Sequence, residues 1–336
     1  GLRALQQGKT RYTPALGLPE LRQAVSRWYG SRFGVDIPAT RIVITPGSST
    51  GLQMLMSALV DPGERVLLPD PGYPCNRNFV YLSDGVPVPV TVTAEQQWLP
   101  TPRQVASSWD DSTGGMVVAS PANPTGALFT PPQLQALVQQ VGRLQGWLVV
   151  DEIYQGLSYE QQPSTALEFD AEHLFVVNSF SKYFGMTGWR LGWLVAPHGC
   201  VDMMDRLAQN LYLSAPTLSQ SAALAAFSDD TLAILEERRE EFRRRRDYLY
   251  PRLKQLGFGM SRPPQGAFYL YADCSALCDD SYAFCEQLLE EQGVAVTPGR
   301  DFGHNRPRQH LRFAYTTSIE KMEQALQRIS LFTASR

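Results

Sequence analysis

From Asn178 to Gly192 the chain reads NSFSKYFGMTGWRLG, a loop of hydroxyl, aromatic and glycine residues around one lysine, Lys182. The sequence has only three other lysines, Lys9, Lys254 and Lys321. Most basic side chains are therefore arginines, and an arginine cannot lose its proton in a protein. A desolvated lysine amine can lose its proton and bond covalently to an aldehyde. We expect Lys182 to act as such a nucleophile, the alternative being an incidental lysine in a surface loop.

Pyridoxal phosphate is the common protein-bound aldehyde that requires a lysine. The hydroxyls of Ser179 and Ser181 and the guanidinium of Arg190 would suit its phosphate. The spacing Ser-Phe-Ser-Lys, followed by glycines and Arg190, resembles the cofactor attachment motif of class I and II aminotransferases. The resemblance implies a Schiff base between Lys182 and pyridoxal phosphate, and the fold-type I architecture of these transferases.

The length and net charge of the chain limit the classes of protein to which it can belong. The chain has 336 residues, a hydrophobic fraction of 43% and a formal net charge of -3, which is ordinary for a globular enzyme of one large or two smaller domains. An acidic balance argues against nucleic acid as a partner. The only basic run, Arg243 to Arg246, follows four glutamates at helical spacing and is expected to be an ion-paired, solvated helix face.

The five cysteines are scattered without metal-ligand spacing, so neither a zinc site nor a disulfide framework is predicted. Such usage fits the reducing cytoplasm, where we expect the protein to act. Apolar runs are too short to span a membrane, and the residues after Gly1 do not resemble a signal peptide. Because the chain does not begin with methionine, we expect a truncated protein.

Short apolar runs alternate with helical segments, which predicts an α/β fold with a largely parallel sheet wrapped by helices. Strands are expected at Val66 to Leu68, Met116 to Ala119, Trp147 to Val150, Phe175 to Val177 and Leu191 to Val195. A long helix from about Thr231 to Leu256 leads to short strands near Ala267 to Tyr271 and Leu311 to Ala314. We therefore predict a large cofactor-binding domain over 31–230, and a smaller α+β domain from 1–30 and 231–336.

The candidate site residues follow the expected strands, where ligands bind in open α/β sheets. Gly47, Ser48 and Ser49 stand at the start of an amphipathic helix, whose free N–H groups favour a phosphate. Hydroxyl residues are also ordinary helix caps, so this turn alone decides little. Its place before Tyr73 and Lys182 strengthens the phosphate interpretation.

Three further residues have roles that the resemblance implies. Tyr73, on the turn Asp70-Pro-Gly-Tyr-Pro, corresponds to the aromatic residue stacked on the pyridine ring. Asn123, in Ser-Pro-Ala-Asn-Pro-Thr-Gly, corresponds to the asparagine that donates to the ring oxygen, and Tyr154 to the tyrosine that shares this oxygen. A packed tyrosine and a simple turn are the structural alternatives.

Asp151 ends an apolar run, Trp147 to Val150, where an unpaired carboxylate would be costly. A protonated pyridine nitrogen would supply the missing cation and keep the ring able to absorb electrons when a substrate Cα–H bond breaks. A cap for the following helix is the alternative role. We expect Lys182, Asp151 and Tyr154 to be the catalytic residues.

Two residues extend the resemblance to the substrate and to a partner chain. Arg312, in His-Leu-Arg-Phe-Ala, corresponds to the arginine that clamps the substrate α-carboxylate, with Asn123 beside it. Tyr12 matches the tyrosine that reaches the phosphate of the neighbouring subunit, which implies a homodimer. Family members usually carry an N-terminal arm with a Gly-x-Pro-type loop that closes over the substrate, and we expect this arm to be missing from this sequence.

The predicted activity is transfer of an amino group from an L-amino acid to a 2-oxo acid in two half-reactions. Some aspartate aminotransferases of this family carry a lysine in the phosphate turn for the distal carboxylate, whereas this chain has Ser48, Ser49 and Thr50. A neutral aliphatic or aromatic donor is therefore favoured, with 2-oxoglutarate or pyruvate as acceptor. The alternatives are a carbon-sulfur β-lyase and the aminotransferase-like domain of a cofactor-binding transcription regulator.

Overall fold

A computed structural model describes residues 1–162 and 164–334 of the chain. The larger of its two sheets has seven strands in the order β1-β7-β6-β5-β4-β2-β3. Their bounds are β1 Ile42–Thr45, β2 Arg65–Asp70, β3 Val86–Thr91, β4 Thr113–Ala119, β5 Trp147–Asp151, β6 Leu174–Ser179 and β7 Gly192–Val195. Only β7 runs antiparallel to its neighbours, β1 and β6. The predicted α/β fold with a mostly parallel sheet is confirmed.

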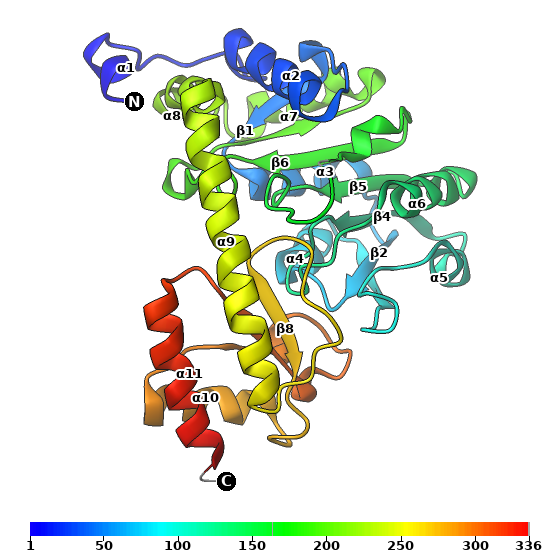
Figure 1. Cartoon of the computed structure of the whole chain (residues 1–336). Coiled ribbons are helices and arrows are strands. Elements are labelled where there is room, and N and C mark those ends of the chain that lie inside the picture. The colour runs from blue at the N-terminus through cyan, green and yellow to red at the C-terminus, as the bar shows by residue number, and fades with distance from the viewer. Residues whose placement is uncertain (163, 335–336) are drawn as a thin grey trace.

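Helices cover both faces of this sheet (Figure 1). The helices are α1 Leu2–Gln6, α2 Pro19–Phe33, α3 Ser48–Leu59, α4 Pro74–Leu82, α5 Pro102–Ser108, α6 Pro131–Arg143, α7 Val201–Leu211, α8 Thr217–Ala223, α9 Asp229–Gln255, α10 Ser281–Gln292 and α11 Ile319–Ala334. Alternate strand residues point to opposite faces. In β5, Leu148 and Val150 pack with α2 and α6, while Val149 packs with α3 and α7. Buried on both sides, the strand carries its carboxyl end, Asp151, into the interior.

Two strands were not predicted from the sequence, β3 of the large sheet and the two-residue β9. β3 contains Pro87 and Pro89, and proline cannot donate to a ladder of hydrogen bonds. The strand lies at the edge of the sheet and pairs only with β2, so both prolines are tolerated there. The sequence VPVPVT therefore looks like a loop although it completes the sheet.

The smaller sheet has the order β8-β10-β9, with β8 Tyr269–Asp273, β9 Thr297–Pro298 and β10 His310–Ala314. Its apolar side packs with α9, α10 and α11 in a separate core that includes Leu253, Phe284 and Phe332. The division into 31–230 against 1–30 with 231–336 stays a prediction. However, Val25 and Trp28 of α2 belong to the core of the large sheet, which argues for grouping α2 with that sheet instead.

The long helix α9 runs from the large sheet past the small one (Figure 1). Its predicted ion pairs form at Glu240 with Arg243, and at Glu241 with Arg244 and Arg245. Arg246 differs from the prediction of a solvated face, because only 3% of its side chain is exposed.

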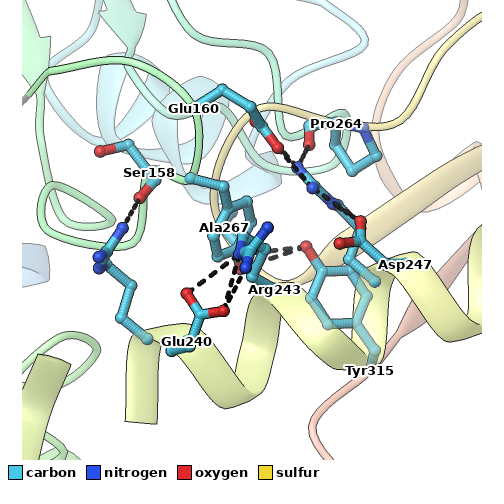
Figure 2. Close-up of polar contacts among 11 residues, drawn as sticks. Ser158, Glu160, Glu240, Arg243, Asp247, Pro264, Ala267 and Tyr315 are labelled. Atoms are coloured by element: carbon cyan, nitrogen blue, oxygen red, sulfur yellow. Dashed lines mark hydrogen bonds and ion pairs between the residues drawn. The ribbon is translucent and has the colours of Figure 1, made fainter. Parts of the chain in front are cut away.

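Figure 2 shows Glu160, Asp247 and Pro264, the hydrogen-bond partners of the buried Arg246. Its guanidinium donates to the carboxylates of Glu160 and Asp247 and, at 2.9 Å, to the carbonyl of Pro264. Tyr315 donates to the carbonyl of Ala267 at 3.2 Å in the same region. These contacts fix the segment that enters β8, and with it the position of Tyr269.

None of the helices in the described ranges 1–162 and 164–334 has the length and hydropathy to cross a membrane.

Candidate active site

A cavity of about 310 Å³ opens where the carboxyl ends of the large-sheet strands meet the small sheet. Its walls come from the start of α3, the turn before α4, the ends of β4 and β5, the loop after β6, and strands β8 and β10. Most of the predicted site residues line it: Ser48, Ser49, Tyr73, Asn123, Asp151, Tyr154, Ser181, Lys182, Arg190 and Arg312. Segments up to 264 residues apart, from Ser48 to Arg312, thus converge on one space.

At one end of the cavity, the N-terminus of α3 faces the guanidinium of Arg190. Gly47, the residue before the helix, has a φ of 86°, and a Cβ built on it would stand 2.7 Å from Nη2 of Arg190. Arg190 itself adopts a left-handed φ of 48° and donates to the carbonyl of Thr187 at 3.2 Å. Free N–H groups, hydroxyls and a planar cation together make an anion site.

Ser179 does not line this cavity. Its buried hydroxyl donates to the carbonyl of Leu191 at 3.2 Å and accepts the N–H of Ser181 at 3.0 Å. The hydroxyl therefore shapes the loop that carries Ser181 and Lys182. Its predicted role as a direct phosphate ligand stays a prediction.

Asp151 is the last residue of β5 and is 4% exposed. Its Oδ1 accepts the N–H of Ile153 at 3.0 Å. Burial raises the pKa of Asp151 to about 6, although this hydrogen bond and the nearby Lys182 act in the opposite direction. The site therefore holds a carboxylate that lacks a close cation of its own.

Lys182 faces the same space from the loop after β6. Burial, and then the positive charges of Arg190 and Arg312, lower the pKa of its amine, while Asp151 opposes the shift. The amine lies 5.7 Å from the ring centres of both Tyr154 and Phe268. Its surroundings favour the uncharged, nucleophilic form that the sequence predicted.

Tyrosines surround the amine. The hydroxyls of Tyr154 and Tyr269 are 2.7 Å apart, and burial raises the pKa of Tyr154 well above its usual value. Burial and the neighbouring thiol of Cys75 also raise the pKa of Tyr73. The sequence analysis gave Tyr269 no role, although it lies in the predicted strand near Ala267 to Tyr271. No sequence pattern could show that its hydroxyl meets that of Tyr154, 115 residues away.

Arg312 stands at the other end of the cavity. It donates from Nη1 to Oδ1 of Asn123 at 2.8 Å, across the gap between the two sheets. Its guanidinium carbon lies 4.2 Å from the ring centre of Tyr269 and 4.8 Å from that of Phe302. The buried Nε atom has no hydrogen-bond partner. A cation with an unused donor, held between two aromatic rings, is suited to bind a carboxylate.

Tyr12 lies outside this cavity, with 81% of its surface exposed. The contacts of this single chain therefore do not bring it to Lys182. Among the described residues, no cluster of side chains could hold a metal ion.

Pyridoxal phosphate fits the residues that are present. The close approach of Arg190 to Gly47 leaves an anion cradle beside α3, and the unpaired carboxylate of Asp151 would face a ring cation. The guanidinium of Arg312, which lines the same cavity, could bind a second anion.

Comparisons with known proteins agree with this geometry. Residues 2–329 match the family described as aminotransferase class I and II. A valine–pyruvate aminotransferase from Mycobacterium tuberculosis is 38% identical over 99% of this chain and 86% of its own length. An aspartate/prephenate aminotransferase from Thermus thermophilus is 36% identical, over 98% and 84%. The crystal structure of an aminotransferase from M. tuberculosis superposes with a TM-score of 0.96 at 38% identity, covering 100% of this chain and 87% of the other. The chain therefore belongs to the class I and II aminotransferases, a family of pyridoxal phosphate-dependent enzymes.

Proposed function

We propose that this aminotransferase binds pyridoxal phosphate at Lys182 and moves the amino group of a neutral L-amino acid to a 2-oxo acid. The observation that carries the proposal is the convergence of Lys182, Asp151, Arg190 and Arg312 on one cavity. Two arginines at opposite ends would hold two anions, the cofactor phosphate and the substrate carboxylate. The amine and the buried carboxylate lie between them.

When bound, pyridoxal phosphate supplies an aldehyde for the lysine amine and a ring that accepts electrons from the substrate. Arg190, Ser48, Ser49 and the N-terminus of α3 would hold its phosphate. Asp151 would pair with the ring nitrogen, and its raised pKa indicates how strongly the carboxylate needs that partner. Tyr73 would cover one face of the ring, and Asn123 with Tyr154 would donate to its oxygen.

The steps that act on the substrate would use Arg312 and Lys182. Arg312 would bind the α-carboxylate through its free donor and so orient the Cα–H bond toward Lys182. The Lys182 amine, whose pKa is lowered by burial and by the charges of Arg190 and Arg312, would take the Cα proton as a general base in its uncharged form. The same group, now protonated, would act as general acid in the second proton transfer, for which the cofactor would supply the acceptor carbon, and water would release the 2-oxo acid. Reversal of these steps on a 2-oxo acid would complete the transfer.

The lining of the cavity supports a neutral donor. Among the described residues that form it, the cations are Lys182, Arg190 and Arg312, and each has a role above. None remains to receive a second carboxylate on the substrate side chain. The name of the M. tuberculosis relative, valine–pyruvate aminotransferase, agrees with a small apolar donor, whereas that of the Thermus relative names aspartate. We propose an aliphatic or aromatic donor and pyruvate or 2-oxoglutarate as acceptor.

A homodimer is the second part of the proposal. α1 lies beside α8 at the top of Figure 1, and apolar side chains are exposed around them. Leu2 is 72% exposed, Leu213 is 58% exposed, and Trp189 beside Gly1 is 42% exposed. Such a patch marks an interaction surface. Tyr12, which follows α1 in the chain, would reach the phosphate of a partner subunit.

The cytoplasmic location expected from the sequence stays a prediction.

The test is an absorbance spectrum of the protein with pyridoxal phosphate, before and after addition of single amino acids without an acceptor. The panel contains L-alanine, L-valine, L-leucine, L-phenylalanine, L-aspartate and L-glutamate. We expect a visible cofactor band that the neutral donors convert to the amine form, with release of the 2-oxo acid. Lys182→Ala should abolish both band and conversion, while Lys254→Ala, on the surface of α9, should change neither.

Other outcomes point elsewhere. Conversion by L-aspartate alone would contradict the neutral donor. Release of pyruvate, ammonia and thiol from cystathionine would instead identify a β-lyase. A band that no amino acid changes would favour a cofactor-binding regulator.

A further inference from the structure

Asp70, at the end of β2, is a buried carboxylate outside the cavity described above. It is 6% exposed, and no ion pair reaches it within the described parts of the chain. Its oxygens instead accept backbone N–H groups, from His304 at 2.9 and 3.1 Å and from Asn305 at 3.2 Å. A buried carboxylate is stable only when such bonds replace its water, so this contact is strongly held.

The donors belong to the Phe302 loop, which we define as residues 299–305 between β9 and β10. This loop comes from the small sheet, while Asp70 belongs to the large one. Two further bonds join the same partners: Gly72 donates to the carbonyl of Phe302 at 2.9 Å, and Asn305 donates from its side chain to the carbonyl of Val92 at 2.9 Å. Asp70 is thus the charged centre of the contact between the two sheets.

Gly303 shows how close the contact is. Its φ is 156°, and a Cβ built on it would stand 1.9 Å from Oδ1 of Asp70. Any side chain at this position would push the loop away from the carboxylate. The loop can therefore approach Asp70 only because residue 303 is glycine.

The Phe302 loop also reaches the cavity. The ring of Phe302 covers the guanidinium of Arg312 on one side, at 4.8 Å, and Tyr269 covers it on another, at 4.2 Å. Tyr269 is fixed within β8, but Phe302 lies on a loop and depends on the contacts of that loop. Its ring also packs on that of Tyr271, with ring centres 6.0 Å apart, while the backbone of its loop is held by Asp70.

We propose that Asp70 is a positioning residue for carboxylate recognition: by binding the Phe302 loop, it seats Phe302 against Arg312 and fixes the direction of the free guanidinium donors. The inference rests on the proposed role of Arg312. It adds a residue that contacts neither cofactor nor substrate, yet should control how tightly every carboxylate substrate binds.

The experiment compares Asp70→Asn, Gly303→Ala and Arg312→Ala in the cofactor-loaded enzyme, with the donor and acceptor that give the highest kcat/KM in the panel. Asp70→Asn removes the negative charge and replaces one of the two accepting oxygens with an amide nitrogen, which cannot accept a backbone N–H. Gly303→Ala displaces the loop from the other side. We expect each to raise KM about tenfold for donor and acceptor alike, the loss typical of one charge-assisted hydrogen bond. The kcat and the dissociation constant of pyridoxal phosphate should change little.

Asp280→Asn is the matched control. Asp280 also accepts a backbone N–H, from Tyr282 at 2.9 Å, but at the start of α10 and outside the cavity. It should leave KM unchanged. If Asp70→Asn does not fold, Phe302→Leu and Gly303→Ala carry the test, and both must raise KM. If Asp70→Asn does fold, adding it to Phe302→Leu should raise KM no further, since the two act through one contact.

Two results would overturn the inference. One is an unchanged KM in Asp70→Asn and Gly303→Ala while Arg312→Ala raises KM, which would leave the proposed function intact. The other is an equal loss of cofactor affinity, which would mean that Asp70 acts through the neighbouring Tyr73 turn. Failure of Arg312→Ala to raise KM would instead contradict the role proposed for Arg312.

Discussion

Arg190 lies directly over Gly47, so that a single added methyl group would stand 2.7 Å from its guanidinium. The two residues are 143 positions apart and meet at the N-terminus of α3. The contact explains why the turn before α3 has a glycine there: the φ of 86° is strained for any other residue, and a side chain would force the Arg190 guanidinium to move.

Gly47→Ala should therefore displace Arg190 and weaken cofactor binding about tenfold or more, the loss expected for one charge-assisted contact. Titration of the protein with pyridoxal phosphate measures this. Gly51→Ala is the control, because its added Cβ would meet Thr45 and Val177 at ordinary distances of 3.5 to 3.7 Å. Equal binding by both variants would show that Arg190 does not hold the phosphate.

Asp151→Asn should increase the stability of the cofactor-free protein at neutral pH but decrease kcat. The folded-state pKa of Asp151, about 6, lies above its ordinary value of 3.8, so the folded protein binds this proton more tightly than the unfolded chain. The free energy of unfolding therefore falls as pH rises from about 4 to about 6. Without cofactor, we expect Asp151→Asn to be more stable than the wild type at pH 7.5, by on the order of 3 kcal/mol.

Urea unfolding at several pH values measures the difference, which should vanish below about pH 4. Glu152, whose pKa burial raises to about 8, titrates in both proteins, and because the charge of Asp151 is the smallest cause of that shift, most of its contribution cancels. The same variant should lose about a hundredfold or more in kcat, since a preorganised charge is removed. A stability difference that does not depend on pH would contradict the burial argument.

Arg312→Lys should raise KM for donor and acceptor about tenfold or more, although the positive charge is kept. A lysine has no planar fork to lie between Tyr269 and Phe302, and it cannot donate to Asn123 and to a carboxylate with the same geometry. Steady-state kinetics with both substrates measure the effect. Arg308→Lys, at a side chain that is 68% exposed, is the control and should behave as the wild type.

Tyr12 gives a test of the shared site. Tyr12→Ala and Lys182→Ala should each be nearly inactive, the first through loss of phosphate binding. If Tyr12 serves the partner subunit, mixing the two variants should restore activity, because a mixed dimer has one site with both native residues. Gel filtration should show that each variant is still dimeric. Absence of recovery after verified subunit exchange would place Tyr12 outside the neighbouring site.

Residues next to strands with clear apolar runs could be predicted from the sequence. Asp151 and Lys182 follow β5 and β6, whose buried positions are continuous, and both line the cavity as expected. The prolines of β3 concealed an edge strand, because edge position is a property of the sheet and not of the segment. Tyr269 and Asp70 were missed for another reason: their partners, Tyr154 and the Phe302 loop, lie more than a hundred residues away. Ser179 was predicted from the motif as a phosphate ligand, but the sequence could not show that its hydroxyl donates to the nearby carbonyl of Leu191.

The charge balance of the cavity has a practical consequence. Three basic side chains, Lys182, Arg190 and Arg312, line the described cavity together with one carboxylate, Asp151, so the cavity favours anions. A protein prepared without cofactor should therefore collect anions from its buffer, and phosphate or sulfate would compete for the place beside Arg190. Slow or incomplete loading with pyridoxal phosphate in such buffers would reflect this competition, and exchange into a chloride-poor, zwitterionic buffer should relieve it.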